Sequence, residues 1–547
     1  MSMRHALGAA AAACTLAVLA TWTTGPAARQ LADDGVITGV VRSDDGPEAG
    51  VWVIAETDDL QTKLVKIVVT DDDGRFLLPQ LPDAAYDLWI RGYGLVDSDK
   101  VTGRPGDDVD LRAVVAPTPR AAAQIYPANY WYSLIEVPDE SEFPGTGPNG
   151  NGISPAMTSQ ARWVDRMKQG CQLCHQLGNR ITREIDQLDD FDSALAAWDH
   201  RVQTGQRGAS MNAGMNRFGR ERGLQMYADW TERIADGELP PAPPRPSGVE
   251  RNLVLTMWDW GRPTAYIHDE IVTDKRNPRV NANGPVYSVD AGHGTLVVTD
   301  PNAHTSTEIV IPVRDDPETI VSRFPQTQLQ PSYYYGDEIL WGNDPDELAD
   351  PHNPMMDGKG RVWMTSTVRG AQGPEWCGEG SDHPSAQWFP MSRTGRRHAS
   401  YYDPATGEFA LLDTCFSTHH LQFGEDPDDT LWFSGSGNVV SWINTRLYDE
   451  TGDEKAAQGW CPKVLDTNGD GRITRPWNEP GGDVDPARDT RIGGGFYGVI
   501  ANPVDHTVWG AETGPFPGRL VRVDRGDNPP ETCIAEVYEP PSIENPD

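Results

Sequence analysis

Two cysteines three positions apart, followed directly by a histidine, restrict the fold of this 547-residue chain more than any other feature. The run is Cys171-Gln172-Leu173-Cys174-His175. Each thiol of such a run can add to one vinyl group of a porphyrin, and a short helical turn then directs the histidine to the iron, so the pattern is typical of covalent haem c attachment. We therefore expect one covalent haem c, held by Cys171 and Cys174 with His175 as the proximal iron ligand.

Two other interpretations of the cysteine pair are weaker. A thioredoxin-like redox site is expected between a strand and a helix and does not require the histidine. A zinc site needs a second pair of ligands nearby, and the next cysteine along the chain is Cys377. The histidine and the spacing together favour haem.

The first 28 residues have the pattern of a secretory signal peptide. Arg4 precedes an apolar stretch from Ala6 to Trp22, and small residues surround Ala27. The stretch is short for a membrane span, although an uncleaved anchor is the alternative. We expect a periplasmic or secreted protein whose mature form has no membrane span.

Export to an oxidising compartment also allows disulfides. Four cysteines remain after those of the haem motif and the signal peptide, namely Cys377, Cys415, Cys461 and Cys533. They permit three pairings, and the pairing of sequence neighbours, Cys377 with Cys415 and Cys461 with Cys533, is preferred. Buried free thiols are the alternative.

The charge balance limits the partners. Lys and Arg number 46 against 81 Asp and Glu, which gives a formal net charge of −35. Such a surface repels nucleic acid and anionic membranes, and it suits a basic soluble redox partner such as a lysine-rich cytochrome. A well-solvated, salt-tolerant surface is the simpler explanation. The 55 Gly and 45 Pro indicate many turns between short strands, and hence a mainly β chain of several domains.

Residues 36–116 have the alternation of a β-sandwich. The run from Thr70 through Asp73-Gly74-Arg75-Phe76, and Gly92-Tyr93-Gly94 after it, resemble the carboxypeptidase regulatory-like domain. That resemblance implies an immunoglobulin- or transthyretin-like sandwich without catalytic residues, serving as a spacer or binding module.

Residues 125–246 carry the haem motif between two proline-rich breaks. Helical spacing is expected over residues 161–170, 191–203 and 220–235, the last with Leu224, Tyr227, Trp230 and Ile234 on one face. This segment resembles a small all-α monohaem cytochrome c domain. By that resemblance a methionine of the glycine-rich loop at residues 208–215 is the sixth iron ligand, either Met211 or Met215, with Met211 favoured; His200 is the competing ligand.

Residues 251–541 contain imperfect repeats of a strand, an acidic turn and a strand with Trp, centred on Trp363, Trp432 and Trp509. Recurring hairpin units predict a β-propeller. The pattern resembles the streptogramin lyase type of propeller, in which inner strands begin with His. We expect six or seven blades.

The same resemblance selects two candidate catalytic residues, His352 and His420, which begin inner strands of the aligned units. Tyr497 replaces the histidine in the third unit, which departs from the lyase pattern. His268 and His383 are further candidates, and a second metal in the propeller channel is an option. Strand alternation predicts that His419 points away from His420.

Residues 466–474 reproduce the first nine positions of a calcium loop, with a turn glycine at position six. The expected ligands are Asp466, Asn468, Asp470 and the carbonyl of Arg472. Position twelve should be Glu but is Trp477, so Glu479 is the substitute that the sequence offers. A tight acidic turn without calcium is the alternative.

Taken together, the sequence predicts an exported haem c oxidoreductase. It would pass electrons from a small-molecule or polymer substrate, oxidised at the propeller, to an external acceptor. A non-enzymatic electron carrier or binding scaffold is the second hypothesis, and a streptogramin lyase-like lyase with an accessory haem is the third.

Overall fold

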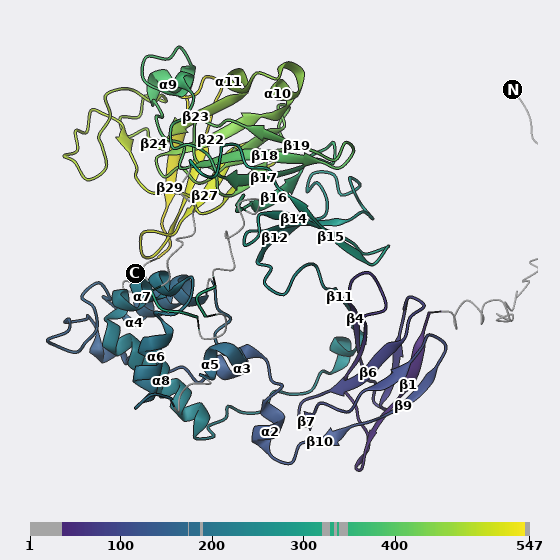
Figure 1. Ribbon diagram of the computed structural model, residues 1–547. Helices are drawn as coiled ribbons and strands as arrows, with labels where there is room; N and C mark the ends of the chain where they lie inside the picture. The colour runs from purple at the N-terminus through teal and green to yellow at the C-terminus, as the bar shows by residue number, and fades with distance from the viewer. Residues whose placement is uncertain are drawn as a thin grey trace, which may run out of the picture.

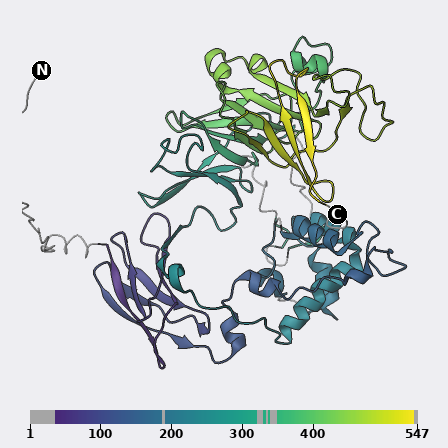
Figure 2. The same ribbon diagram turned by 180° about the vertical axis from the view of Figure 1, so that it is seen from behind.

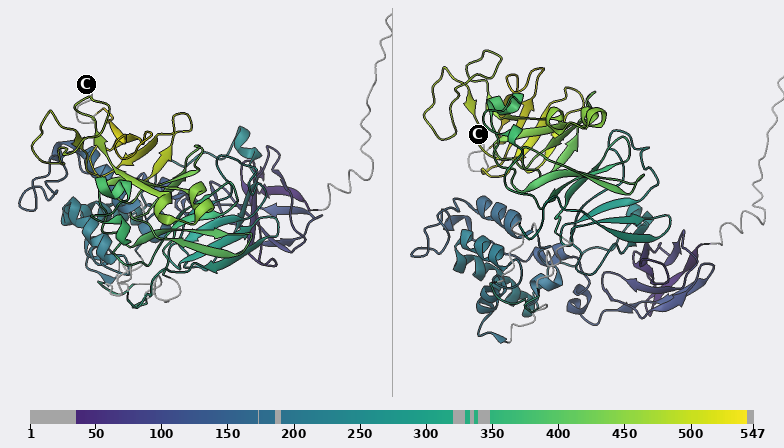
Figure 3. Two further views of the ribbon diagram at one scale, coloured as in Figure 1. Left: turned by 90° about the horizontal axis from the view of Figure 1, so that it is seen from above. Right: turned by 45° about the horizontal axis from the view of Figure 1, so that its top comes forward.

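The computed structural model describes residues 35–172, 174–185, 190–319, 329–332, 336–338 and 348–541, and the predicted signal peptide lies outside them. The chain forms a β-sandwich, a helical part and a series of antiparallel sheets (Figure 1). The antiparallel sheets lie over the helical part, with the sandwich to one side (Figures 2 and 3). Within the described ranges, no helix combines the length and the apolar character that a bilayer crossing needs.

The sandwich packs two sheets around a buried aliphatic core. One sheet contains β2 (Gly46–Pro47), β1 (Ile37–Ser43), β5 (Arg75–Leu78) and β9 (Asp108–Arg112); the other contains β11 (Leu255–Trp258), β4 (Leu64–Val69), β3 (Trp52–Thr57), β6 (Tyr86–Arg91) and β8 (Val101–Gly103); β7 (Leu95–Val96) and β10 (Val114–Val115) form a small ribbon. β11 pairs with β4 although it follows residue 251, where the sequence predicts that the propeller begins. The chain therefore returns to the sandwich after the proline-rich linker.

The helical part has a core of buried aromatic residues that includes Trp131, Trp163 and Trp230. Its helices are α2 (Pro119–Ala123), α3 (Ala128–Tyr132), α4 (Gln160–Met167), the π-helical turn η2 (Lys168–Gln172), α5 (Arg180–Arg183), α6 (Ala194–Arg201), α7 (Gly208–Phe218) and α8 (Arg220–Ala235). All four residues predicted on one face of α8 are buried, so that prediction is confirmed.

The glycine-rich stretch at residues 208–215 is a helix, α7, and not the predicted loop. Each glycine costs about 1 kcal/mol of helix propensity relative to alanine. Met211, Met215 and Phe218 recur at helical spacing and pack on the core, which offsets that cost. Gly219 then ends the helix with φ +97°, and a Cβ there would lie 2.0 Å from the Gly152 carbonyl oxygen.

The C-terminal part forms four successive antiparallel sheets with the strand order of propeller blades. The first contains β12 (Ile267–Ile271), β13 (Val286–Asp290), β14 (Thr295–Asp300) and β15 (Thr305–Val310); the second β16 (His352–Met356), β17 (Val362–Thr367), β18 (Arg397–Asp403) and β19 (Glu408–Leu412); the third β20 (Leu421–Phe423), β21 (Thr430–Phe433), β22 (Val439–Asn444) and β23 (Gln458–Pro462); the fourth β26 (Val499–Ala501), β27 (Val508–Glu512), β28 (Arg519–Asp524) and β29 (Ile534–Tyr538), extended by β24 (Val464–Leu465) and β25 (Thr490–Arg491). The innermost strands β12, β16, β20 and β26 are neighbours in that order.

The three repeats found in the sequence are the first two strands of the second, third and fourth sheets. The described residues form four blades against the six or seven expected. Within the described ranges, long connections take up much of the length between strands. The helix α9 (Pro384–Trp388) lies between β17 and β18, α10 (Thr445–Thr451) and α11 (Glu454–Ala457) lie between β22 and β23, and residues 466–489 separate β24 from β25.

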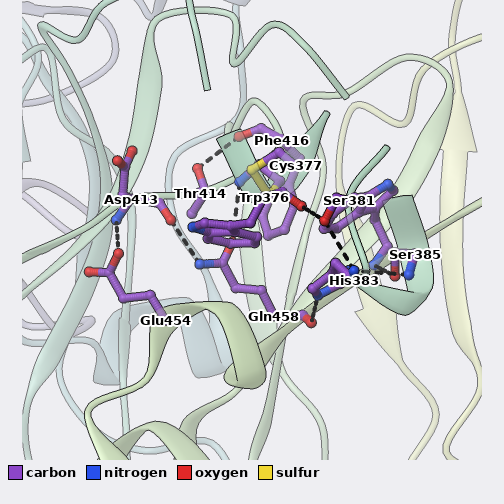
Figure 4. Close-up of a disulfide and its surroundings, with 12 residues drawn as sticks. Trp376, Cys377, Ser381, His383, Ser385, Asp413, Thr414, Phe416, Glu454 and Gln458 are labelled. Atoms are coloured by element: carbon purple, nitrogen blue, oxygen red, sulfur yellow. Dashed lines mark hydrogen bonds between the residues drawn. A yellow bond between two sulfur atoms is a disulfide. The ribbon is translucent and has the colours of Figure 1, made fainter. Parts of the chain in front are cut away.

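Two disulfides brace these sheets, Cys377–Cys415 and Cys461–Cys533, as the preferred pairing of sequence neighbours predicts. The first joins the connection before α9 to the segment after β19 (Figure 4). The second joins β23 of the third sheet to the residue before β29 of the fourth. Both disulfides are fully buried.

Candidate functional site

A largely apolar cavity of about 50 Å³ lies in the helical part, between η2, α6, α7 and α8. Cofactor pockets typically measure about 300–1,000 Å³, so a group as large as haem would have to displace part of the lining to enter this one. Four of the predicted haem residues line it: Cys171, His175, Met211 and Met215. Trp198 supplies an aromatic wall. The fold therefore gathers around one cavity residues that are up to 44 positions apart in the sequence.

The haem motif folds into a tight turn at the cavity mouth. The amide of His175 donates to the Cys171 carbonyl oxygen over 3.0 Å, which brings the imidazole and the first thiol to the same side. Cys171 is half-buried and Cys174 is exposed. Both thiols are free, whereas the other four described cysteines are in disulfides, so both are available for thioether bonds.

The cavity favours the protonation state of His175 that metal ligation needs. Burial lowers the pKa of His175, and the Arg201 cation adds to this effect, so the imidazole is neutral near pH 7 and can coordinate a metal. Burial raises the pKa of the Cys171 thiol, which lies beside the Tyr227 hydroxyl. A neutral imidazole and a protonated thiol are both suited to a ligand pocket that excludes water.

One buried donor at the cavity also matches a carboxylate-bearing cofactor. Thr182 Oγ1 lines the cavity and is buried without a hydrogen-bond partner among the described residues. Leaving such a group unpaired costs about 1–3 kcal/mol, so an acceptor that reaches it would be stabilised. The hydroxyl, thiols, imidazole and thioethers match the chemistry of haem c.

The two candidate thioethers differ in their surroundings. Met215 is 4% exposed, and its Sδ packs so close to α8 that a Cβ on Gly223 would lie 2.7 Å from it. Met211 is half-buried and lies one turn earlier on the same face of α7. His200, the competing ligand, does not line the cavity and packs its ring 5.1 Å from Phe191. Met215 therefore behaves as a core residue, and Met211 is the freer sulfur.

Four histidines and a tyrosine meet where the innermost strands of the four sheets come together. We call His268, His352, His419, His420 and Tyr497 the axis cluster. Ring centroids are 4.2 Å apart for His268 and His352, 4.3 Å for His419 and His420, and 4.7 Å for His420 and Tyr497. Each sheet supplies at least one member, at or just before its first strand. The two predicted catalytic histidines are therefore brought together, and His268 joins them.

Asp269 organises one side of the axis cluster. Its Oδ2 lies 2.6 Å from His268 Nδ1 and accepts from the Asn353 amide over 2.9 Å. Burial, the largest single effect, opposes ionisation of Asp269, but the hydrogen bond and charge of His268, the Asn353 amide and His420 together outweigh it and lower the pKa. The aspartate is therefore charged near neutral pH.

His420 is the member best suited to accept a proton. Burial lowers its pKa, although Asp269 opposes the shift, so the imidazole is neutral near pH 7. Its Nε2 is buried and lacks a hydrogen-bond partner among the described residues. His352, in contrast, receives a hydrogen bond from Arg397 over 3.0 Å at Nδ1.

Two sequence predictions about histidines fail. His419 does not point away from His420, since their rings stack at 10°; both residues precede β20, where strand alternation does not apply. His383 lies outside the axis cluster. It caps α9, accepting from the Ser385 amide (Figure 4). Its ring also stacks on that of Trp460, with the centroids 4.6 Å apart.

Tyr266 adjoins the axis cluster. It immediately precedes β12, and its ring centroid lies 5.8 Å from that of His268. Burial raises the pKa of Tyr266, and charge on Cys174 and Tyr497 adds to the shift. The connection between α6 and α7 contacts the segment between β15 and β16, because the Gly205 amide donates to the Gln330 carbonyl over 3.0 Å. The helical part and the C-terminal part therefore touch at this point.

The predicted calcium loop forms a compact turn on the fourth sheet. Asp466 accepts from the amides of Gly469 and Gly471, and Asp470 accepts from the amide of Arg472. Asn468 accepts from the Asp470 amide. Across the ranges that the structure describes, no three His, Cys, Asp or Glu side chains form a ready metal site.

Comparisons with known proteins add little. No protein-family model and no curated protein matches the chain. Among solved structures, it is similar to a gluconolactonase-like protein at 10% identity over 47% of this chain and 61% of that chain, with a TM-score of 0.21. It is similar to YCF48 from Cyanidioschyzon merolae at 10% identity over 49% of this chain and 59% of that chain, with a TM-score of 0.21. The chain thus spans less than two thirds of the length of either solved structure. The candidate site is therefore argued only from the residues and distances of this chain.

Proposed function

We propose that this protein is an exported redox protein that binds one haem c in its helical part and oxidises a substrate at the axis cluster. The observation that carries the proposal is that Cys171, His175 and Met211 line one largely apolar cavity. The ring centroid of Tyr266 lies 5.8 Å from that of His268 in the axis cluster, and its charge interaction with Cys174 supports a short path for electrons from a substrate held there.

Haem c, held by Cys171, Cys174, His175 and Met211, would supply one-electron chemistry in the cavity. The chain contributes the rest. His420 is neutral and partly sequestered, so it can take a proton from a bound substrate, while the charged Asp269 stabilises a positive imidazole beside it. The ring centroid of Tyr497 lies 4.7 Å from that of His420. Tyr497 is exposed, so its hydroxyl is available to a substrate that enters from solvent.

Export is supported by the two disulfides in addition to the signal-peptide pattern, because disulfides persist in oxidising compartments. The net charge of −35 supports a basic soluble protein as electron acceptor. The acceptor would approach by electrostatic steering.

Haem binding is tested first. The full chain is expressed in a bacterial host that matures c-type haem, and we expect the mass of one haem on the purified protein. Cys171→Ala with Cys174→Ala should yield colourless protein of unmodified mass, whereas the control His200→Ala should keep the haem. Wild-type protein that remains colourless overturns the proposal.

The substrate site is tested next, by screening small molecules and polymers for reduction of the haem iron. For each compound that reduces it, His420→Ala should slow reduction about 100-fold, the usual weight of a general base. The control His383→Ala, remote from the axis cluster, should leave it unchanged. Reduction that survives in His420→Ala places the site elsewhere.

One observation favours an electron carrier as the second candidate. His268 and His352 already hydrogen-bond to Asp269 and Arg397, as histidines of a structural axis would. A carrier would exchange electrons with a basic cytochrome but show no substrate-dependent reduction. The same screen therefore separates the two functions.

A further inference from the structure

Residues 466–489 leave the fourth sheet and return to it. β24 and β25 pair with Leu465 opposite Thr490, so the two ends of this excursion are held together. The Asn478 amide donates to the Asp489 carbonyl over 2.7 Å, which fixes the returning strand against the middle of the excursion. Asp489 is thereby placed beside the predicted calcium loop.

Asp489 is a buried carboxylate that the protein satisfies on one side only. Its side chain is 0% exposed. Oδ2 accepts from the Thr474 amide over 2.7 Å and from Thr474 Oγ1 over 3.0 Å, and Thr474 is position nine of the loop. Oδ1 is buried with no hydrogen-bond partner in the described part of the chain. An ionised carboxylate in this setting is costly unless a cation reaches it.

Glu479, the substitute that the sequence offers for position twelve, is committed elsewhere. Its Oε1 accepts from Trp477 Nε1 over 2.8 Å, and its Oε2 accepts from Arg491 Nε and Nη2 over 2.8 and 2.6 Å. Both oxygens therefore already have donors, and Arg491 neutralises the charge.

We propose that Asp489, and not Glu479, completes a calcium site with Asp466, Asn468, Asp470, the Arg472 carbonyl and Thr474. These groups supply six oxygens, three of them on carboxylates, within the six to eight that calcium takes. The three carboxylates do not converge on one point in the described structure, so calcium binding is expected to draw Asp466 and Asp470 toward Asp489. Thr474, at position nine of the loop, already donates two hydrogen bonds to Asp489.

The position of this calcium predicts its role. Ile473, at position eight, is 1% exposed, and its amide donates to the Glu531 carbonyl over 2.8 Å. Ile473 packs with Val464 and Ile534, which adjoins Cys533. Calcium at this loop would therefore stabilise the packing of residues 466–489 against β29, the last strand of the fourth sheet. The site is independent of the proposed redox function.

The test is a calcium titration of the full-length protein after treatment with EDTA. We expect calcium to bind and to raise the melting temperature. Terbium should also bind and luminesce, with Trp477 at position twelve as the energy donor. Asp489→Asn keeps the size of the side chain and should weaken calcium binding about tenfold or more, since calcium affinity follows the charge of its ligands.

Glu479→Gln is the matched control and should bind calcium like the wild type. A loss in Glu479→Gln equal to that in Asp489→Asn overturns the proposal, as does a wild-type protein that binds no calcium. If Asp489→Asn does not fold, Asp470→Asn serves as the second variant, and it should lose binding while Glu479→Gln keeps it. Unchanged affinity in Asp470→Asn would also overturn the proposal.

Discussion

The choice between Met211 and Met215 as iron ligand can be decided by two substitutions that should fail in different ways. Met215 is 4% exposed and packs its sulfur on α8 at Gly223. Its replacement by alanine leaves a cavity in the core and should cost about 3 kcal/mol of unfolding free energy. Met211 is half-buried, so Met211→Ala should cost about 1 kcal/mol through lost apolar contact.

The haem spectrum and the reduction potential should change more in Met211→Ala than in Met215→Ala, which is the opposite of the order expected for stability. Met211→Ala should abolish the charge-transfer band between sulfur and ferric iron. It should also lower the reduction potential by on the order of 100 mV, part of the ~0.8 V range that axial ligands span. Met215→Ala should keep the band and nearly the same potential.

Visible spectroscopy, redox titration and denaturant unfolding of the same three proteins provide the measurements. Met226→Ala is a matched control, because Met226 is also buried and accepts a hydrogen bond from Trp163 in the core. It should destabilise the helical part without changing the band. The reasoning is refuted if Met215→Ala loses the band while Met211→Ala keeps it.

Three further predictions concern the propeller and the surface. Burial, with Arg369 and other cations adding to it, lowers the pKa of His398 to about 3, so the unfolded chain takes up a proton below pH 6.5 that the folded chain does not. Stability should therefore fall from pH 7 to pH 5 by about 2 kcal/mol more in the wild type than in His398→Gln, and parallel denaturation curves would contradict this. Replacing Cys377 and Cys415 by serine, which opens a loop of 38 residues, should cost about 4 kcal/mol in denaturant unfolding without changing the haem spectrum; a loss below about 1 kcal/mol would refute the chain-entropy estimate. Electron transfer to a lysine-rich cytochrome should slow as ionic strength rises from 0.01 to 0.15 M, where the screening length falls from about 30 to 8 Å, and a rate independent of salt would exclude steering by the acidic surface.

Local patterns in the sequence predict a substantial part of this fold. The apolar face of α8 follows from helical spacing alone, and its four residues are buried as expected. The repeats centred on Trp363, Trp432 and Trp509 locate the first hairpin of three sheets, because alternation and turn chemistry are local properties. The disulfide pairing also follows sequence proximity.

Features that depend on tertiary packing were not predictable in the same way. The glycines of α7 suggest a loop, but Met211, Met215 and Phe218 bury one face of that segment and make it helical. β11 has no local signal for the sandwich, since its place is decided by the exposed edge of β4. The described residues form four blades where six or seven were expected, and the sequence cannot separate the two counts, because long connections and additional strands have similar lengths.

The axis cluster shows how repeat position and tertiary geometry combine. The repeats correctly place His352, His420 and Tyr497 at equivalent positions, but the first sheet lacks a clean repeat, and its His268 is identified only when the four inner strands meet. Side chains at equivalent positions of neighbouring blades must converge, because the inner strands pack side by side around one axis. Gathering several imidazoles there is unfavourable when they are charged, and burial accordingly lowers the pKa of His420. A site that keeps a neutral imidazole, with its Nε2 unpaired among the described residues, beside an ionised Asp269 retains a proton acceptor at neutral pH.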